Sequence, residues 1–191
     1  MKTFSDYMRI QNEIIKASKN NDKIDRLIDF IFQKSKNQHL DILTAGNGGS
    51  SSTAEHFAAD LSLTYKRTSR PINAVCLSSQ SSLLTALSND LHYSSSLDYQ
   101  INNWKDRNVL LIVFSASGMS KNILNLVQKA LEFRIPTFCF VGFDGGLLAR
   151  IPNLEPILFK DDKKNYGHVE NIHLISCHYI IEKLNERILL P

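Results

Sequence analysis

Five short, uninterrupted apolar runs constrain the fold of this chain more than any other feature of its sequence. Each run is continuous rather than alternating in polarity, which is typical of strands whose two faces are both covered. Segments with the periodicity of helices separate most of the runs. This alternation predicts an α/β fold with a doubly wound parallel sheet of about five strands. The apolar runs are residues 40–45, 72–77, 109–114, 137–142 and 156–159.

Two further helices are predicted before the first strand. Residues 3–36 carry apolar side chains at helical spacing, with a polar break at Asn20, Asn21 and Asp22. We therefore expect one domain over residues 1–191, made of an N-terminal helical pair (1–36) and an α/β core with a closing helix (37–191). The other helices are expected at residues 53–63, 82–87, 121–133 and about 169–189.

Composition and charge place the chain among ordinary soluble proteins. Its 191 residues are 43% hydrophobic and 21% charged, with a formal net charge of +3, so nothing in the charge pattern favours nucleic acid. The charged N-terminal segment has no long apolar run, which argues against a signal peptide or a membrane span. Three widely spaced cysteines, Cys76, Cys139 and Cys177, predict reduced core residues in a cytoplasmic protein rather than disulfides or a zinc knuckle.

Two loops rich in glycine and serine follow the first and third predicted strands, at residues 46–53 and 115–120. Ligands of doubly wound sheets bind at the carboxyl ends of the strands. Glycines allow close approach of the backbone, hydroxyls can donate hydrogen bonds, and the N-terminus of the following helix attracts an anion. Neither loop matches the Walker pattern or a dinucleotide fingerprint. Each alone could be a serine-capped helix start, but two on neighbouring strands favour a bound phosphate without a nucleotide base or Mg²⁺.

Acid/base residues lie on two of the predicted helices. His56 and Asp60 stand one helical turn apart, about 6 Å, and could act together or simply form a solvated helix face. Glu170 and His178 are separated by about 12 Å of helix rise, so they could share a metal only if Glu170 lies at or before the helix start. Asp90 follows a short helix and could contact sugar hydroxyls or cap that helix.

Together these segments resemble the phosphoheptose isomerase branch of the sugar isomerase (SIS) domain family. GNGGSSSTAEHFAADL, TALSND, FSASGMS, VGFDGG and HVENIHLISCH occur in that order with compatible spacing, over nearly the whole chain. The resemblance implies a flavodoxin-like SIS fold and a homotetramer with active sites between subunits. It also implies conversion of sedoheptulose 7-phosphate to D-glycero-D-manno-heptose 7-phosphate through an enediol, for lipopolysaccharide or capsule synthesis in bacteria.

The resemblance further implies roles for individual residues. Asp60 and His178 would form the acid/base pair, and some family members bind zinc at positions that correspond here to His56, Asp60, Glu170 and His178. One Zn²⁺ per subunit is therefore expected. The residues implied in substrate binding are Asn47, Gly49, Ser50, Asp90, Ser115, Ala116, Ser117, Ser120 and Glu170.

The chain departs from the family pattern at chemically important positions. Asp60 stands where the family has Glu, which keeps the carboxylate but shortens its reach. Glu170 stands where the family has Gln, which adds a negative charge that a divalent cation would compensate. The alternative is a non-catalytic SIS protein that binds a partner, similar to the replication-initiator-associating proteins of this family. Those proteins have typically lost the acid/base pair, whereas Asp60 and His178 still carry titratable groups, which favours the enzyme.

Overall fold

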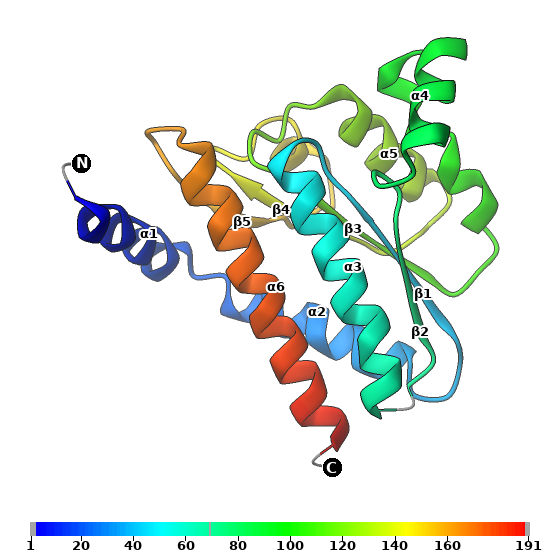
Figure 1. Ribbon diagram of the computed structural model, residues 1–191, viewed down its shortest axis with the longest axis horizontal. Helices are drawn as coiled ribbons and strands as arrows, with labels where there is room; N and C mark the ends of the chain where they lie inside the picture. The colour runs from blue at the N-terminus through cyan, green and yellow to red at the C-terminus, as the bar shows by residue number, and fades with distance from the viewer. Residues whose placement is uncertain (1–2, 69, 190–191) are drawn as a thin grey trace.

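The structure is a computed structural model that describes residues 3–68 and 70–189, apart from the side chains of residues 65–67. Five parallel strands form one sheet in the order β2-β1-β3-β4-β5 (Figure 1). This arrangement confirms the predicted doubly wound α/β fold, and four of the five strands are buried along most of their length because helices cover both faces. The strands are β1 Leu40–Ala45, β2 Ile72–Cys76, β3 Val109–Ser115, β4 Thr137–Gly142 and β5 Ile157–Phe159.

Helices cover the two faces of the sheet unequally. α3 and α6 lie side by side on one face together with α1 and α2, while α5 packs on the other face (Figure 1). Each face has its own apolar cluster, one around Phe57, Phe114 and Phe140 and the other around Leu111 and Val127. The helices are α1 Phe4–Ser18, α2 Asn21–Lys34, α3 Gly49–Thr68, α4 Ser81–Asp90, α5 Lys121–Glu132 and α6 Tyr166–Leu189, with 3-10 turns η1 Tyr93–Ser95, η2 Gln100–Trp104 and η3 Leu148–Arg150.

Two sequence expectations about the helices and the core can be checked directly. Cys76, Cys139 and Cys177 are buried and free, as predicted. α3 begins at Gly49, four residues before the predicted start, because the glycine- and serine-rich loop itself supplies the first helical turn. No helix in the described ranges has a stretch long and apolar enough to cross a bilayer.

The strand order places a topological switch point between β1 and β3. The chain passes from β1 to β2 on one side of β1, and then returns to place β3 on the other side. The last residue of β1, Ala45, pairs with Val113 near the end of β3. The loops that follow these two strands therefore leave from adjacent points at the same edge of the sheet, where ligands of such folds bind.

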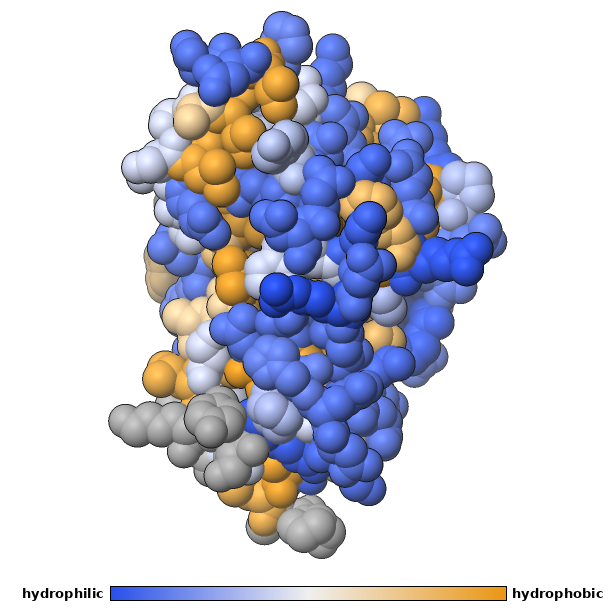
Figure 2. Space-filling view, turned by 90° about the vertical axis from the view of Figure 1, so that its right-hand side faces the viewer, coloured by the Kyte–Doolittle hydropathy of each residue, from blue (hydrophilic) through white to orange (hydrophobic). Residues whose placement is uncertain are grey.

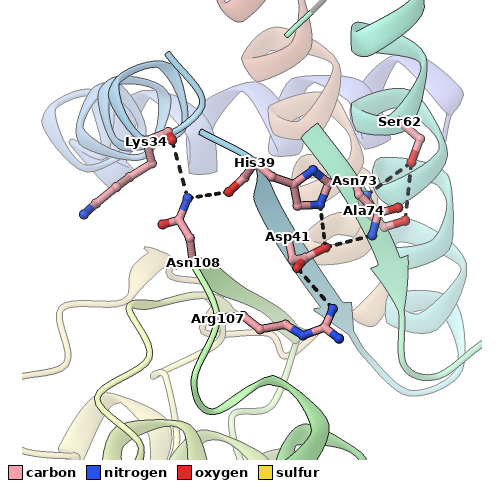
Figure 3. Close-up of polar contacts among 8 residues, drawn as sticks. All are labelled: Lys34, His39, Asp41, Ser62, Asn73, Ala74, Arg107 and Asn108. Carbon is pink, nitrogen blue, oxygen red and sulfur yellow. Dashed lines mark hydrogen bonds and ion pairs between the residues drawn. The ribbon is translucent and has the colours of Figure 1, made fainter. Parts of the chain in front are cut away.

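A polar cluster ties together the starts of three strands at the opposite end of the sheet (Figure 3). The nearly buried Asp41 of β1 accepts a hydrogen bond from Asn73 of β2 at 2.9 Å. Its carboxylate also lies 3.1 Å from Nε2 of His39 and 3.7 Å from the guanidinium of Arg107, just before β3. Asn108 donates to the carbonyl of His39 at 2.7 Å. A buried carboxylate needs such partners, so this cluster fixes the strand starts relative to one another.

The N-terminal helix α1 holds the first turn of α6. The ring of Tyr7 packs on the buried His168, with ring centroids 4.3 Å apart, and Gln11 donates to the His168 carbonyl at 3.4 Å. Just before α6 in the sequence, the buried Asp161 accepts hydrogen bonds from the backbone N–H groups of Lys163 and Asn165. These contacts position the start of α6, and with it the residues that α6 carries towards the switch point.

Candidate active site

A cavity of about 90 Å³ lies between the loop after β1 and the loop after β3. It is closed on its third side by the first turns of α6. Seven of the predicted substrate-binding residues reach this cavity, although the two loops are more than 60 residues apart in sequence. The lining residues are Asn47, Ser50, Phe114, Ser115, Ala116, Ser117, Ser120, Tyr166 and Glu170.

The loop after β3 presents hydroxyl groups in a defined orientation. Ser115 Oγ accepts a hydrogen bond from the N–H of Gly118 at 3.1 Å, and Ser117 Oγ accepts from the N–H of Met119 at 3.3 Å. Neither hydroxyl donates a hydrogen bond to another described residue, so each can donate its hydrogen to a ligand. Ser120 is the N-cap residue of α5 and makes no capping bond to that helix in the described structure. The loop thus offers hydroxyl donors at a helix N-terminus, which suits an oxyanion.

The shape of this loop depends on the loop after β4. Gly118 has φ +62°, and a Cβ on it would collide with the carbonyl oxygen of Gly145. Its own carbonyl accepts a hydrogen bond from the N–H of Leu148 at 3.1 Å, while the Ala116 carbonyl accepts from the N–H of Gly142 at the same distance. Glycine is required at position 118 both for its backbone conformation and for this close contact.

Glu170 of α6 lies over the N-terminus of α3. Its carboxylate accepts a hydrogen bond from the N–H of Ser50, and a Cβ on Gly49 would collide with both carboxylate oxygens. Burial raises the pKa of Glu170 above its usual range, and the hydrogen bond from Ser50 offsets part of that effect. Glu170 is therefore the carboxylate that a phosphate would meet in this cavity.

His56, Asp60 and His178 form a second group, on the facing sides of α3 and α6. Nε2 of His56 lies 3.4 Å from Oδ2 of Asp60, and the rings of His56 and His178 are 5.1 Å apart between centroids. One ligand atom from each of the three residues lies within 4.8 Å of the others. Beside the group, an open groove of about 620 Å³ runs along the second half of α6, and Asp60 of α3 lines its end together with His178. The arrangement can move protons, and its two nitrogens and one oxygen can also bind a cation.

Two predicted site residues differ from expectation: Glu170 lines the cavity but not the histidine–aspartate group, and Asp90 lines no cavity beside the loops. α6 begins at Tyr166, so Glu170 lies inside the helix, and the structure leaves it outside the group formed by His56, Asp60 and His178. The expected four-residue metal site therefore contains three residues in this geometry. Asp90 is the exposed last residue of α4 and is not among the residues that line either cavity beside the loops.

The sequence analysis did not identify three residues that the structure brings to the site. Tyr166, in the first turn of α6, lines the cavity, and its ring packs edge-to-face on Phe143 at 5.0 Å. Asn122 of α5 and Tyr93 of η1 both hydrogen bond to Asn47. The position of Asn122, two residues after Ser120 at the start of a helix, was a usable signal. No sequence pattern indicated Tyr93.

Comparison with known proteins identifies the family of this chain. The family model for the SIS domain matches residues 4–142, which includes both loops and α3 but ends before α6. A phosphoheptose isomerase of Helicobacter pylori (strain Shi470) is 35% identical over 141 residues, 74% of this chain and 72% of that protein. A phosphoheptose isomerase of Aliarcobacter butzleri is 31% identical over 147 residues, 77% of this chain and 76% of that protein. The chain therefore belongs to the SIS domain family and, within it, to the phosphoheptose isomerases.

Solved structures show the same fold. The phosphoheptose isomerase GmhA of Neisseria gonorrhoeae superposes with a TM-score of 0.82 at 24% sequence identity, covering 96% of this chain and 95% of that one. A phosphoheptose isomerase of Francisella tularensis gives a TM-score of 0.83 at 21% identity, covering 95% and 96%. Both coverages extend over almost the full chain, so the fold likeness includes α6, which lies outside the family model.

Proposed function

We propose that this protein is a cytoplasmic aldose–ketose isomerase that converts sedoheptulose 7-phosphate to D-glycero-D-manno-heptose 7-phosphate, for lipopolysaccharide or capsule synthesis. The observation that carries the proposal is the pairing of a hydroxyl-lined cavity at the starts of α3 and α6 with a separate acid/base group further along the same two helices. The names of the relatives support the choice of a heptose phosphate as substrate.

The spacing between the two parts of the site fits a long, open-chain sugar phosphate. His56 follows Ser50 by six residues on α3, about 9 Å of rise, and His178 follows Glu170 by eight residues on α6, about 12 Å. Eight bonds separate C1 of a seven-carbon ketose from the phosphorus of its 7-phosphate. At about 1.2 Å per bond, as in an extended backbone, that chain spans about 10 Å. A phosphate held between the loops thus places C1 and C2 near the acid/base group.

Phosphate binding in this cavity would rest on neutral donors. No lysine or arginine is among its lining residues in the described part of the chain. The attraction would come from the positive ends of α3 and α5 together with the serine hydroxyls. Binding energy from this remote group would hold the reacting carbons in place, which is how a phosphate anchor raises the rate at the other end of a substrate.

The isomerisation needs one proton moved between C1 and C2 and another moved between their oxygens. We assign these transfers to Asp60 and His178, without fixing which acts as base and which as acid. His56, 3.4 Å from Asp60, holds that carboxylate in place across one turn of α3. The group is half-exposed, with Asp60 at 26% and His56 at 48% side-chain exposure, so a substrate can reach it from solvent.

The same three residues fit one zinc ion per subunit. Two imidazoles and a carboxylate are a common protein ligand set for catalytic zinc, which keeps one coordination position open. When bound, zinc would polarise the oxygens on C1 and C2 as a Lewis acid. Glu170 is not required as a ligand in this arrangement. Zinc binding is an alternative to the metal-free assignment above. His56 and His178 would then hold the metal by neutral ring nitrogens and Asp60 by a carboxylate oxygen, so the bound nitrogen of His178 would not transfer a proton.

A homotetramer completes the proposal, as the family resemblance implies. Hydrophobic side chains are exposed on several helices, and Figure 2 shows such side chains gathered at the top of the molecule, over α4. Large exposed apolar surfaces favour association. Light scattering should give a mass near four times 21.7 kDa at micromolar concentration, and a monomer would contradict this. The exposed hydrophobic residues on or next to α1, α3, α4 and α6 include Phe4, Met8, Leu63, Leu83, Leu91, Tyr166, Ile175, Tyr179 and Leu189.

The decisive experiment is incubation with sedoheptulose 7-phosphate and with other ketose phosphates, with and without Zn²⁺, followed by NMR. Formation of heptose 7-phosphate supports the proposal. Ser117→Asp should abolish sugar-phosphate binding, because its carboxylate would face the phosphate, and Ser79→Asp, outside the cavity, serves as the control. A wild-type protein that binds a ketose phosphate but isomerises none of those tried would instead favour a binding protein.

A further inference from the structure

Asn47, in the loop after β1, is held by two side chains from other parts of the fold. Its Nδ2 donates to Oδ1 of Asn122 at 2.9 Å, and its Oδ1 accepts from Nδ2 of Asn122 at 2.8 Å. The hydroxyl of Tyr93 donates to the same Oδ1 at 2.8 Å. The two amides thus form a closed pair between the loop and the first turn of α5, and Tyr93 adds a third bond from η1.

Among the described residues, these bonds leave the side chain of Asn47 with a single free hydrogen-bonding group. A side-chain amide has two acceptor positions on its oxygen and two N–H donors. Tyr93 and Asn122 use both acceptor positions of Asn47, and Asn122 uses one of its N–H groups. The remaining N–H can only donate. Asn47 is therefore fixed as a donor, which is the property that an oxyanion needs.

Asn47 forms part of the wall between two cavities. It lines the 90 Å³ cavity between the loops, and it also lines a neighbouring cavity of about 120 Å³ together with Tyr93 and Asn122. We propose that Tyr93 and Asn122 are positioning residues that hold the free N–H of Asn47 for the substrate phosphate. This inference rests on the proposed function, because it takes the ligand of the first cavity to be a sugar phosphate.

The two residues differ in what else depends on them. Asn122 is buried, so its amide needs partners whether or not a ligand binds. Tyr93 is 52% exposed, and water could satisfy its hydroxyl at little cost. The η1 segment is held separately, since Asn125 donates to the carbonyl of Ser94 at 2.9 Å. The Tyr93 hydroxyl is therefore not needed for folding, and its removal tests positioning alone.

Tyr93→Phe removes only this hydroxyl. We expect the Kd for inorganic phosphate, measured by calorimetry, and the KM for the ketose phosphate to rise about 3- to 10-fold, the usual range for one hydrogen bond. The kcat should stay within about twofold and the Tm should not change. Tyr99→Phe is the matched control, because Tyr99 is similarly exposed nearby and lines neither cavity.

Asn122→Asp should weaken phosphate binding more, because a carboxylate oxygen would then face the oxygen of Asn47 and bring a negative charge near the anion. In an Asn47→Ala background, Tyr93→Phe should have no further effect on the Kd, since the hydroxyl acts through Asn47.

Four results would overturn the inference. Unchanged Kd and KM in Tyr93→Phe would show that the hydroxyl does not position Asn47. A fall in both kcat and Tm in Tyr93→Phe would show that the hydroxyl has a structural role. An additive effect in the Asn47→Ala background would show that Tyr93 acts by another route. A wild-type protein that binds no phosphate would refute the proposed site as well, so the two failures are distinguishable.

Discussion

The stability of this protein should fall in mild acid because of one buried histidine. His173 of α6 has no solvent exposure, and its ring lies about 6 Å between centroids from the rings of Phe114, Phe140 and Phe159. Burial lowers its pKa from 6.5 to about 4. The backbone of Val141 opposes this only weakly, since neither ring nitrogen has a hydrogen bond of ordinary geometry among the described residues.

The size of the effect follows from these two pKa values. The unfolded chain takes up a proton on this ring near pH 6.5, whereas the folded chain does so only near pH 4, so acid favours the unfolded state between them. A difference of about 2.5 pKa units, at 1.36 kcal/mol per unit, corresponds to about 3 kcal/mol. This stability is fully present above pH 6.5 and is lost progressively as the pH falls to 4.

His173→Phe should remove this pH dependence, because a phenyl ring in place of the imidazole cannot be protonated. Urea unfolding followed by circular dichroism, at a fixed protein concentration and at several pH values from 7.5 to 4.5, would measure it. His92→Gln is the control, since His92 is exposed and its loss should leave the pH dependence unchanged. An NMR titration of the wild-type ring gives an independent readout. The reasoning fails if that ring titrates near pH 6.5 in the folded protein, or if His173→Phe loses as much stability in acid as the wild type.

Substitutions at three other positions test the site. Asp60→Asn removes the charge at constant size and should lower turnover by about two to four orders of magnitude, with little change in sugar-phosphate affinity. Asp60→Glu should stay measurably active. Full activity of Asp60→Asn would refute the role assigned to Asp60. Glu170→Gln should tighten phosphate binding about 5- to 30-fold at pH 8, because it removes a negative charge from the cavity. The gain in affinity, measured by calorimetry, should become smaller as the pH falls towards the raised pKa of Glu170. An equal gain at all pH values would contradict this. Gly118→Ala should lower the unfolding free energy by about 1–3 kcal/mol and raise KM, because residue 118 must leave its φ of +62°. Unchanged urea unfolding would show that the close contact of Gly118 with the loop after β4 does not stabilise the fold.

The strands and the two loops could be predicted because their signals are local. A continuous apolar run such as Leu40–Ala45 specifies a strand covered on both faces, and its bounds in the structure match the prediction. Parallel strand order then brings the loops after β1 and β3 together, as expected. The i, i+4 spacing of His56 and Asp60 likewise needs only a helix, and the structure shows the pair in contact.

The remaining features depend on how elements rotate against one another. Glu170 points to the N-terminus of α3 because of the way α6 packs on α3, and no spacing in the sequence encodes that rotation. Tyr93 reaches Asn47 only because η1 packs against α5. The place of Asp90 at the end of α4 depends on the path of that helix, which no spacing in the sequence encodes, and its contact with sugar hydroxyls stays a prediction.

Because α3 and α6 run in parallel, the number of helical turns between the cavity and the titratable groups sets the length of sugar chain that fits the site. Both helices start at the cavity between the loops, and both carry titratable groups about two to three turns further along. Moving those groups by one turn would change the span by about 5.4 Å, the length of four or five bonds of an open sugar chain. A shift of one residue would instead rotate them off the facing sides of the helices. The span can therefore change only in steps of a whole turn, which is longer than the difference between two sugars that differ by one carbon. Such sugars must be distinguished by side-chain length, as with Asp in place of Glu at position 60.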